Sequence, residues 1–201
     1  MLEWINVIVL FFSMIFFSYF YLLSIQPVKR ERNRGVRAWK ECYIFRFVSW
    51  VFNLLMVINV LLWIWLPVPN LDWKVASDHI TSIIAGLIFS IPFSIILIKG
   101  VVDAGKETLQ PSRKTKLYGG IYNYIRHPQT LGEFPLFIAL GFIVNSLFII
   151  FIMTFFILVF TPIMISLEEK DLLRKFGNNY REYQKRTGAI FPRIIKNDES
   201  I

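Results

Sequence analysis

Long apolar runs, separated by shorter segments that hold nearly all of the charge, dominate the pattern of hydrophobic and polar positions. A helix needs roughly 20 apolar residues to cross the hydrocarbon core of a bilayer. The stretches 4–25 and 80–98 contain no charged residue, and 43–66 contains one, Arg46, whose long side chain can reach the headgroups. The pattern therefore predicts transmembrane helices over these three stretches.

A further apolar run, residues 131–167, holds a single charge, Glu133, and is too long for one crossing. It predicts a hairpin of two helices, over 128–144 and 147–167, that turns at Asn145-Ser146. The whole pattern thus predicts an all-α integral membrane protein with five transmembrane helices and a helical C-terminal tail. Neither an internal repeat nor a Pro-rich linker divides the 201 residues, so we expect a single membrane domain.

The basic residues predict how these helices are oriented. Nearly all of the 22 Lys and Arg residues lie in segments 26–42 and 99–126 and in the tail from residue 168 onward. With five crossings these segments share one side of the membrane, and an excess of Lys and Arg marks the cytoplasmic side. The N-terminus is then expected outside and the C-terminal tail in the cytoplasm. The net charge of +8 is expected to meet anionic membrane lipids and not nucleic acid.

The composition excludes several classes of protein and site. Hydrophobic residues make up 55% and charged residues 18% of the chain, whereas soluble domains average about 45–50% apolar and about 25% charged residues. A soluble globular domain and a disordered chain are therefore excluded. The single cysteine, Cys42, rules out a disulfide within the chain, and two His residues leave little for a metal site, so none is expected. No GxGxxG, P-loop, HExxH or GxSxG motif is present.

Residues 119–128 place unusual chemistry at the start of the fourth predicted helix. Two glycines give the backbone freedom, and Arg126, His127 and Pro128 put a fixed cation, an imidazole and a helix-starting proline in a row. Backbone amides at a helix start can hold a carboxylate or a phosphate. The structural alternative is a basic linker at the membrane surface with an interfacial histidine.

Acidic residues lie at or near two predicted helix ends. Glu168 and Glu169 directly follow an apolar run and could hold a cationic group such as an ammonium, or they could be ordinary solvated charges. Glu133 lies inside a predicted crossing, where a carboxylate is costly and indicates function unless it reaches the headgroups. Farther on, Tyr180 and Tyr183 share one face of a predicted tail helix, which could lie on lipid and could also close a pocket.

Five short pieces follow one another along the second half of the chain. They are Gly120-Ile121-Tyr122, Arg126-His127-Pro128 with Gly132 and Gly141, Glu168-Glu169, Phe176-Gly177 with Tyr180 and Tyr183, and Phe191-Pro192. In this order and spacing they resemble the superfamily of isoprenylcysteine carboxyl methyltransferases and phospholipid methyltransferases, which are integral membrane enzymes. The resemblance covers roughly residues 104–192, where the cofactor is expected to bind.

The resemblance implies a methyltransferase that uses S-adenosylmethionine and acts on a lipophilic substrate at the cytoplasmic face of the membrane. It implies that Glu168 meets the cofactor ammonium and that Arg126 or His127 meets its carboxylate or adenine. Tyr122 is expected to pack on the adenine ring. For an amine or thiol acceptor, Glu133 and His127 are the candidates for the base that takes the proton. The cofactor-binding residues that the resemblance implies are Lys116, Leu117, Gly120, Tyr122, His127, Pro128, Gln129, Thr130, Glu168, Glu169, Tyr180 and Tyr183.

Two departures from the family pattern bear on the substrate. The family usually reads His-Pro-x-Tyr where this chain has His127-Pro128-Gln129-Thr130, so an aromatic residue is missing from the cofactor wall. Members that act on prenylated cysteine usually carry an Arg about one turn before the acidic pair, where this chain has Ile163-Met164-Ile165. These departures put a prenylcysteine substrate in doubt. A phospholipid amine, a prenyl thioether acid, a quinone or terpenoid and a small thiol all remain open as acceptors.

Two other classes of function compete with the methyltransferase. Membrane sterol reductases share a related C-terminal half, so an NADPH-dependent membrane reductase is one alternative. A non-catalytic membrane scaffold is the other, and it predicts that no cofactor binds.

Overall fold

The computed structural model describes residues 1–108, 112–113 and 119–193. Within these residues the chain is helical, and an isolated bridge between Ile125 and Gly188 is the only β-type pairing. The all-helical prediction is confirmed. The helices are α1 Leu2–Ser24, α2 Pro27–Arg34, α3 Arg37–Leu62, α4 His79–Ala104, α5 Pro128–Ile143, α6 Leu147–Phe176 and α7 Asn178–Arg186, with the short 3₁₀-helices η1 Pro69–Leu71, η2 Gly105–Thr108 and η3 Gly120–Asn123.

Four helices, α1, α3, α4 and α6, are long and apolar enough to cross a membrane. Helices α4 and α6 cover the stretches predicted at 80–98 and 147–167. Helices α1 and α3 cover most of the stretches predicted at 4–25 and 43–66 but end earlier, at Ser24 and Leu62. The stretch predicted at 128–144 forms α5, which has 16 residues and is shorter than the other four. Large apolar side chains are exposed on the outer faces of the long helices, as contact with lipid requires; among them are Ile88, Phe151 and Leu158.

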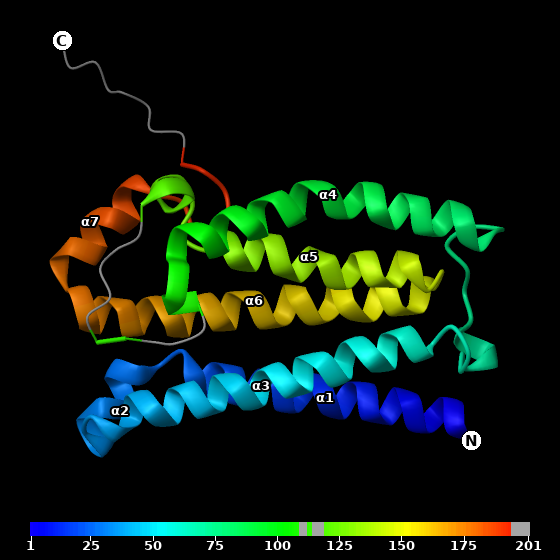
Figure 1. Ribbon diagram of the computed structural model, residues 1–201, viewed down its shortest axis with the longest axis horizontal. Coiled ribbons are helices and arrows are strands. Elements are labelled where there is room, and N and C mark those ends of the chain that lie inside the picture. The colour runs from blue at the N-terminus through cyan, green and yellow to red at the C-terminus, as the bar shows by residue number, and fades with distance from the viewer. Residues whose placement is uncertain (109–111, 114–118, 194–201) are drawn as a thin grey trace, which may run out of the picture.

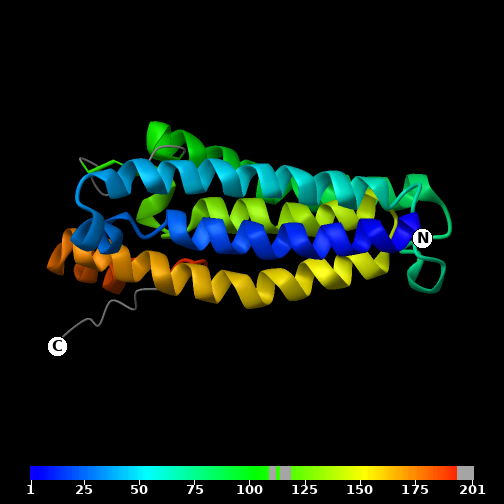
Figure 2. The same ribbon diagram turned by 90° about the horizontal axis from the view of Figure 1, so that it is seen from below.

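The long helices run side by side along one elongated bundle, seen from two directions in Figures 1 and 2. Helix α5 packs against α4 and α6, α1 pairs with α3, and the two groups also meet where α3 contacts α5 and α1 contacts α6. Gly132 allows α4 and α5 to approach closely, because a Cβ atom at this position would lie 2.5 Å from the backbone nitrogen of Leu97. The motif glycine therefore serves helix packing.

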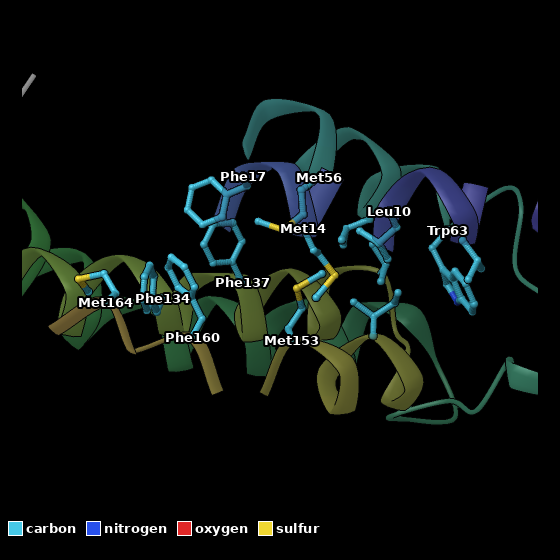
Figure 3. Close-up of a cluster of buried hydrophobic side chains, with 14 of the residues drawn as sticks. Leu10, Met14, Phe17, Met56, Trp63, Phe134, Phe137, Met153, Phe160 and Met164 are labelled. Carbon is cyan, nitrogen blue, oxygen red and sulfur yellow. The ribbon is translucent and has the colours of Figure 1, made fainter. Parts of the chain in front are cut away.

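Buried apolar side chains fill the space between these two groups of helices (Figure 3). Apolar side chains dominate the middle of the bundle, although the polar residue Ser13 is also buried there, beside Met14 on α1. Its labelled members are Leu10, Met14 and Phe17 from α1, Met56 from α3, Trp63 just after α3, Phe134 and Phe137 from α5, and Met153, Phe160 and Met164 from α6.

The end of the bundle near the N-terminus contains the turn between α5 and α6. The turn falls at Asn145 and Ser146, as predicted, with a φ of 51° at Asn145. The Asn145 side chain accepts hydrogen bonds from the backbone N–H groups of Val75 and Ala76, each at 3.0 Å. The Ser146 hydroxyl caps α6 by accepting from the N–H of Ile149. This end is closed by its own hydrogen bonds.

The opposite end gathers α2, α7 and the segment before α5 (Figures 1 and 2). Helix α6 continues past the predicted boundary at residue 167, because the next break comes only at Gly177, whose φ is 57°. The chain then folds back through α7. Backbone hydrogen bonds tie it to the segment before α5: the N–H of Arg126 donates to Gly188 at 2.8 Å, and that of His127 to Ala189 at 3.0 Å.

Candidate active site

A cavity of about 300 Å³ lies at this polar end of the bundle. Residues from each of the α-helices α1 to α7, together with Thr108 of η2 and Tyr122 of η3, contribute to its wall. Its volume is at the lower end of the range of about 300–1,000 Å³ that is typical of small-molecule sites. Most of the residues predicted for the site line this cavity, namely Tyr122, Arg126, His127, Pro128, Gln129, Thr130, Glu133, Glu168, Tyr180 and Tyr183.

The other predicted residues do not line the cavity or are outside the described part of the chain. Gly120 lies behind the wall with a φ of 62°, and the N–H of the next residue, Ile121, donates to the Asp103 carboxylate at 2.7 Å. Glu169 also lies behind the wall, where it supports residues that line the cavity. Lys116 and Leu117 fall outside the described residues.

His127 is buried between the two carboxylates of the acidic pair. Its Nδ1 lies 3.2 Å from Glu168 Oε2 and its Nε2 lies 3.1 Å from Glu169 Oε1. Both nitrogens must donate, and only the protonated imidazolium can do so. Burial opposes this charge, but the hydrogen bonds to Glu168 and Glu169 outweigh it and raise the pKa of His127 to about 9. At neutral pH the ring is therefore a cation without a lone pair to accept a proton.

Arg126 connects α6 to α7. Its Nε lies 2.7 Å from Glu169 Oε1, and its Nη1 donates to the carbonyls of Gln184, at 3.3 Å, and of Thr187. The Gln184 amide donates in turn to Glu169 Oε2 at 2.8 Å. The guanidinium thus holds α7 over the cavity, and most of its hydrogen-bonding capacity is used within the protein.

Tyr122 is fixed at both its hydroxyl and its carbonyl. Its hydroxyl donates to the Gly100 carbonyl at 3.2 Å and accepts from the Gln129 amide at 3.0 Å. The Tyr183 hydroxyl donates to the Tyr122 carbonyl at 2.6 Å. Gln129 thus strengthens the wall next to Thr130, and Thr130 is the residue that stands where the family usually has a tyrosine.

Helix α3 contributes a polar face that was not predicted as part of the site. Arg46, Ser49, Trp50 and Asn53 are spaced by three, four and seven positions, which places them on one helical face, and all four line the cavity. The Asn53 amide donates to Glu133 Oε1 on α5 at 3.3 Å. Helical spacing of polar residues inside an apolar stretch could have indicated this face. The sequence does not say which helix the face meets.

Two buried polar atoms near this cavity lack partners. Arg46 Nε and the Tyr180 hydroxyl have no hydrogen bond to any described residue, and each such atom costs about 1–3 kcal/mol if it stays unpaired. Arg46 and Tyr180 both line the cavity, so a polar ligand would satisfy these atoms. The Glu168 carboxylate suits an ammonium, and the rings of Trp39 and Tyr122 suit a flat heterocycle.

These groups fit the S-adenosylmethionine that the sequence motifs imply. The cofactor combines an ammonium, a carboxylate and an adenine ring, and the cavity wall offers a carboxylate, a cation with an unpaired N–H and aromatic rings. No group of three His, Cys, Asp or Glu side chains that could hold a metal ion occurs in the described ranges.

Comparison with known proteins agrees with the motifs. Residues 84–179 match the family model described as Phospholipid methyltransferase, which confirms the resemblance. The chain is 30% identical over 158 residues to a Methanethiol S-methyltransferase of Pseudomonas deceptionensis, covering 72% of this chain and 58% of the relative. It is 32% identical over 188 residues to Methanethiol S-methyltransferase 1 of Bradyrhizobium diazoefficiens, covering 85% of this chain and 64% of that relative. The chain thus spans less than two thirds of either relative. No solved structure matches it.

Proposed function

Because residues 84–179 match the model of the phospholipid methyltransferase family, we propose that the protein transfers a methyl group from S-adenosylmethionine to a small lipophilic thiol. The observation that carries this proposal is the cavity at the polar end of the bundle. Motif residues Tyr122, His127 and Glu168 converge on it from three separate segments of the chain. The names of the two relatives support a small thiol as the acceptor.

The proposal includes a topology with five crossings. At 1.5 Å per residue, the 16 residues of α5 extend roughly 24 Å, less than the roughly 30 Å of a bilayer core. It packs between α4 and α6, so its neighbours can shield its ends. Five crossings put the basic segments and the cavity on the cytoplasmic side, with the N-terminus outside. The chain then forms one membrane domain whose cofactor-binding part is about 104–192.

The cofactor would lie in the cavity with its ammonium at Glu168. When bound, S-adenosylmethionine would supply a methyl group attached to a positively charged sulfur. His127 holds one oxygen of Glu168 at 3.2 Å and so orients this carboxylate. Tyr122 and Trp39 offer ring faces for adenine, and Tyr180 and Tyr183 cover the cavity from α7. Exclusion of water and fixed orientation are the main contributions that the protein must make to such a transfer.

The acceptor thiol requires a base, and Glu133 is the better placed of the two candidates. His127 is already protonated at neutral pH, because both of its nitrogens face carboxylates. Glu133 lines the cavity, and Asn53 holds one of its oxygens. The S–H bond would break with its electron pair left on sulfur, and the proton would pass to a Glu133 oxygen. Arg126 has a positioning role, since it holds α7 in place.

Calorimetric titration of S-adenosylhomocysteine into the full chain, purified in detergent, tests the cofactor. We expect Glu168→Gln to weaken binding at least about tenfold, because a hydrogen bond to a charged group contributes about 1.5–3 kcal/mol. Glu182→Gln is the matched control, because the Glu182 side chain is 62% exposed and pairs with Lys185 on the surface of α7. NADPH is expected not to bind. Unchanged affinity in Glu168→Gln, or no binding by folded wild-type protein, would contradict the proposal.

A second assay tests the acceptor separately. The wild-type protein is incubated with S-adenosylmethionine and methanethiol, and dimethyl sulfide is measured in the headspace. Product is expected with wild type and with Glu182→Gln, and is expected to fall in Glu168→Gln. If S-adenosylhomocysteine binds but no dimethyl sulfide forms, the cofactor assignment stands and the thiol assignment fails.

A further inference from the structure

Arg46 is a half-buried cation in the apolar part of α3, and its hydrogen bonding among the described residues is incomplete. Its Nη1 donates to the backbone carbonyl of Thr108 at 3.2 Å, and its Nε is buried without a hydrogen-bond partner among the described residues. A charge inside a membrane helix is costly and is found where it meets a partner or a ligand. Arg46 lines the cavity, so a ligand in the cavity can supply the missing acceptor.

The other cations around the cavity already have partners. Arg126 binds Glu169 and two carbonyls of the C-terminal region. His127 lies between two carboxylates. Lys175 donates to the Ser112 carbonyl at 2.6 Å and lies over the ring of Trp39. Arg46 therefore differs from these cations in having a buried N–H directed at no acceptor.

Glu168 provides the opposite charge across the cavity, on α6. The charge of Arg46 acts on Glu168, yet no ion pair joins the two side chains in the described part of the chain. Both charges also act on the phenol of Tyr21, which lines the cavity from α1. A carboxylate and a guanidinium from two helices thus face the same space without touching.

This arrangement is complementary to the free end of an amino acid. An α-amino acid group carries an ammonium and a carboxylate on one carbon, so it needs an anion and a cation a few ångströms apart. Glu133 does not compete for Arg46, since it takes its hydrogen bond from Asn53. Asn53 lies seven residues farther along α3, roughly 10 Å at 1.5 Å per residue. The cavity therefore has two polar compartments, one at Arg46 and Glu168 and one at Glu133 and Asn53.

We propose that Arg46 and Glu168 form a zwitterion site that holds the amino-acid end of the cofactor, with the carboxylate on Arg46 and the ammonium on Glu168. This inference rests on the proposed function. It assigns the cofactor carboxylate to α3, which lies outside the matched range 84–179, and not to Arg126 or His127. The N-terminal half of the chain then takes part in cofactor binding.

Calorimetry with two ligands tests the site without an activity assay. The probes are S-adenosylhomocysteine and its analogue that lacks the carboxylate. Wild type is expected to bind S-adenosylhomocysteine at least about tenfold more tightly than the analogue, and Arg46→Gln is expected to lose this preference. Arg46→Gln should bind the analogue within about twofold of wild type. Arg37→Gln is the matched control, because Arg37 is exposed at the start of the same helix.

Each outcome decides for or against the site. Equal affinity of wild type for the two ligands would overturn the assignment without any variant, so a misfolded Arg46→Gln does not weaken the test. Equal losses of both ligands in a folded Arg46→Gln would make Arg46 a structural residue and also overturn it. Arg46→Lys keeps a point charge and is expected to retain part of the preference. Folded wild type that binds neither ligand would remove the proposed function, whereas binding without preference removes only the zwitterion site.

Discussion

The two halves of the molecule contribute very different polar groups to one cavity. In the half built from α4–α7, His127 pairs with two carboxylates, and Glu169, behind the wall, is held by three side chains, although the Tyr180 hydroxyl has no partner among the described residues. In the half built from α1–α3, the partners among the described residues are the Thr108 carbonyl for Arg46 and the Glu133 side chain for Asn53. The C-terminal half is therefore organised before a ligand binds, and the N-terminal half is not.

This difference suggests that the two halves of the molecule have different roles in ligand binding. A pre-formed hydrogen-bond lattice keeps its groups in place and lowers the reorganisation needed for catalysis. Residues with few internal partners are free to be satisfied by whatever ligand the cavity accepts. The family match covers 84–179 and so includes most of the organised half. The organised half therefore supplies fixed groups, and Arg46 of the half built from α1–α3 is left to be satisfied by the ligand.

The largest expected effect follows from a change that breaks the organised half directly. In Gly132→Val, the added Cβ would lie 2.5 Å from the Leu97 nitrogen and 2.6 Å from its Cα, so α4 and α5 must separate. Overpacking of this kind costs typically about 1–3 kcal/mol and occasionally more, and backbone contacts place this site at the upper end. We expect little monodisperse protein and a much lower melting temperature, measured by size exclusion and thermal unfolding.

Gly119→Ala is the control for this substitution. A Cβ at Gly119 would meet nothing within 4 Å, and its φ of −105° suits any residue. It should therefore unfold like wild type. If Gly132→Val were as stable as Gly119→Ala, the close packing of α4 on α5 would not be what holds the organised half together.

A change of pH should weaken the same half by a smaller amount. The pKa of His127 is raised from 6.5 to about 9, so the folded state binds its proton more tightly than the unfolded state. The resulting stability is complete below pH 6.5 and is lost as the pH rises through about 9. We expect the melting temperature to fall further between pH 7 and pH 10 in wild type than in His127→Gln. The corresponding loss of unfolding free energy should be larger in wild type by a few kcal/mol.

The comparison between wild type and His127→Gln removes the contribution of other groups that titrate in the same range. A difference that stays constant from pH 7 to pH 10 would mean that His127 carries no proton in the folded protein. The ring would then have a free nitrogen, and it would return as a candidate for the base.

The sequence predicts the organised half, α4–α7, better than the half built from α1–α3, which we call the open half. The reason is physical. Arg126-His127-Pro128 and Glu168-Glu169 are contiguous pieces, and each lines or supports the cavity. The partners of Arg126 could not be predicted, because Gln184 lies on α7 and Thr187 directly after it, and the chain returns to Arg126 only by folding back at Gly177. Local spacing reveals the membrane helices and their polar faces, but tertiary packing decides which faces meet.

Helix α3 in the open half shows this limit of local spacing. Arg46, Ser49 and Asn53 show helical spacing in the printed sequence, yet the same spacing would suit a helix face toward headgroups. Only the contact of Asn53 with Glu133 places the face toward α5. In the same way, the apolar run predicted at 128–144 contains α5, but its 16 residues leave its membrane crossing a proposal.

The smallest expected effect comes from Asn53→Ala, which tests whether the compartment at Glu133 and Asn53 serves the acceptor and not the cofactor. Removing one neutral hydrogen bond costs about 1 kcal/mol, so methyl transfer to methanethiol should fall about fivefold through a less well oriented Glu133. Affinity for S-adenosylhomocysteine should stay within about twofold of wild type, because Asn53 lies two turns from Arg46 on α3. A more acidic aromatic thiol needs less help from a base and should lose less rate than methanethiol. Asn179→Ala, at an exposed position on α7, is the control. If Asn53→Ala weakened binding of S-adenosylhomocysteine as much as it slowed transfer, the cavity would not be divided into a cofactor compartment and an acceptor compartment.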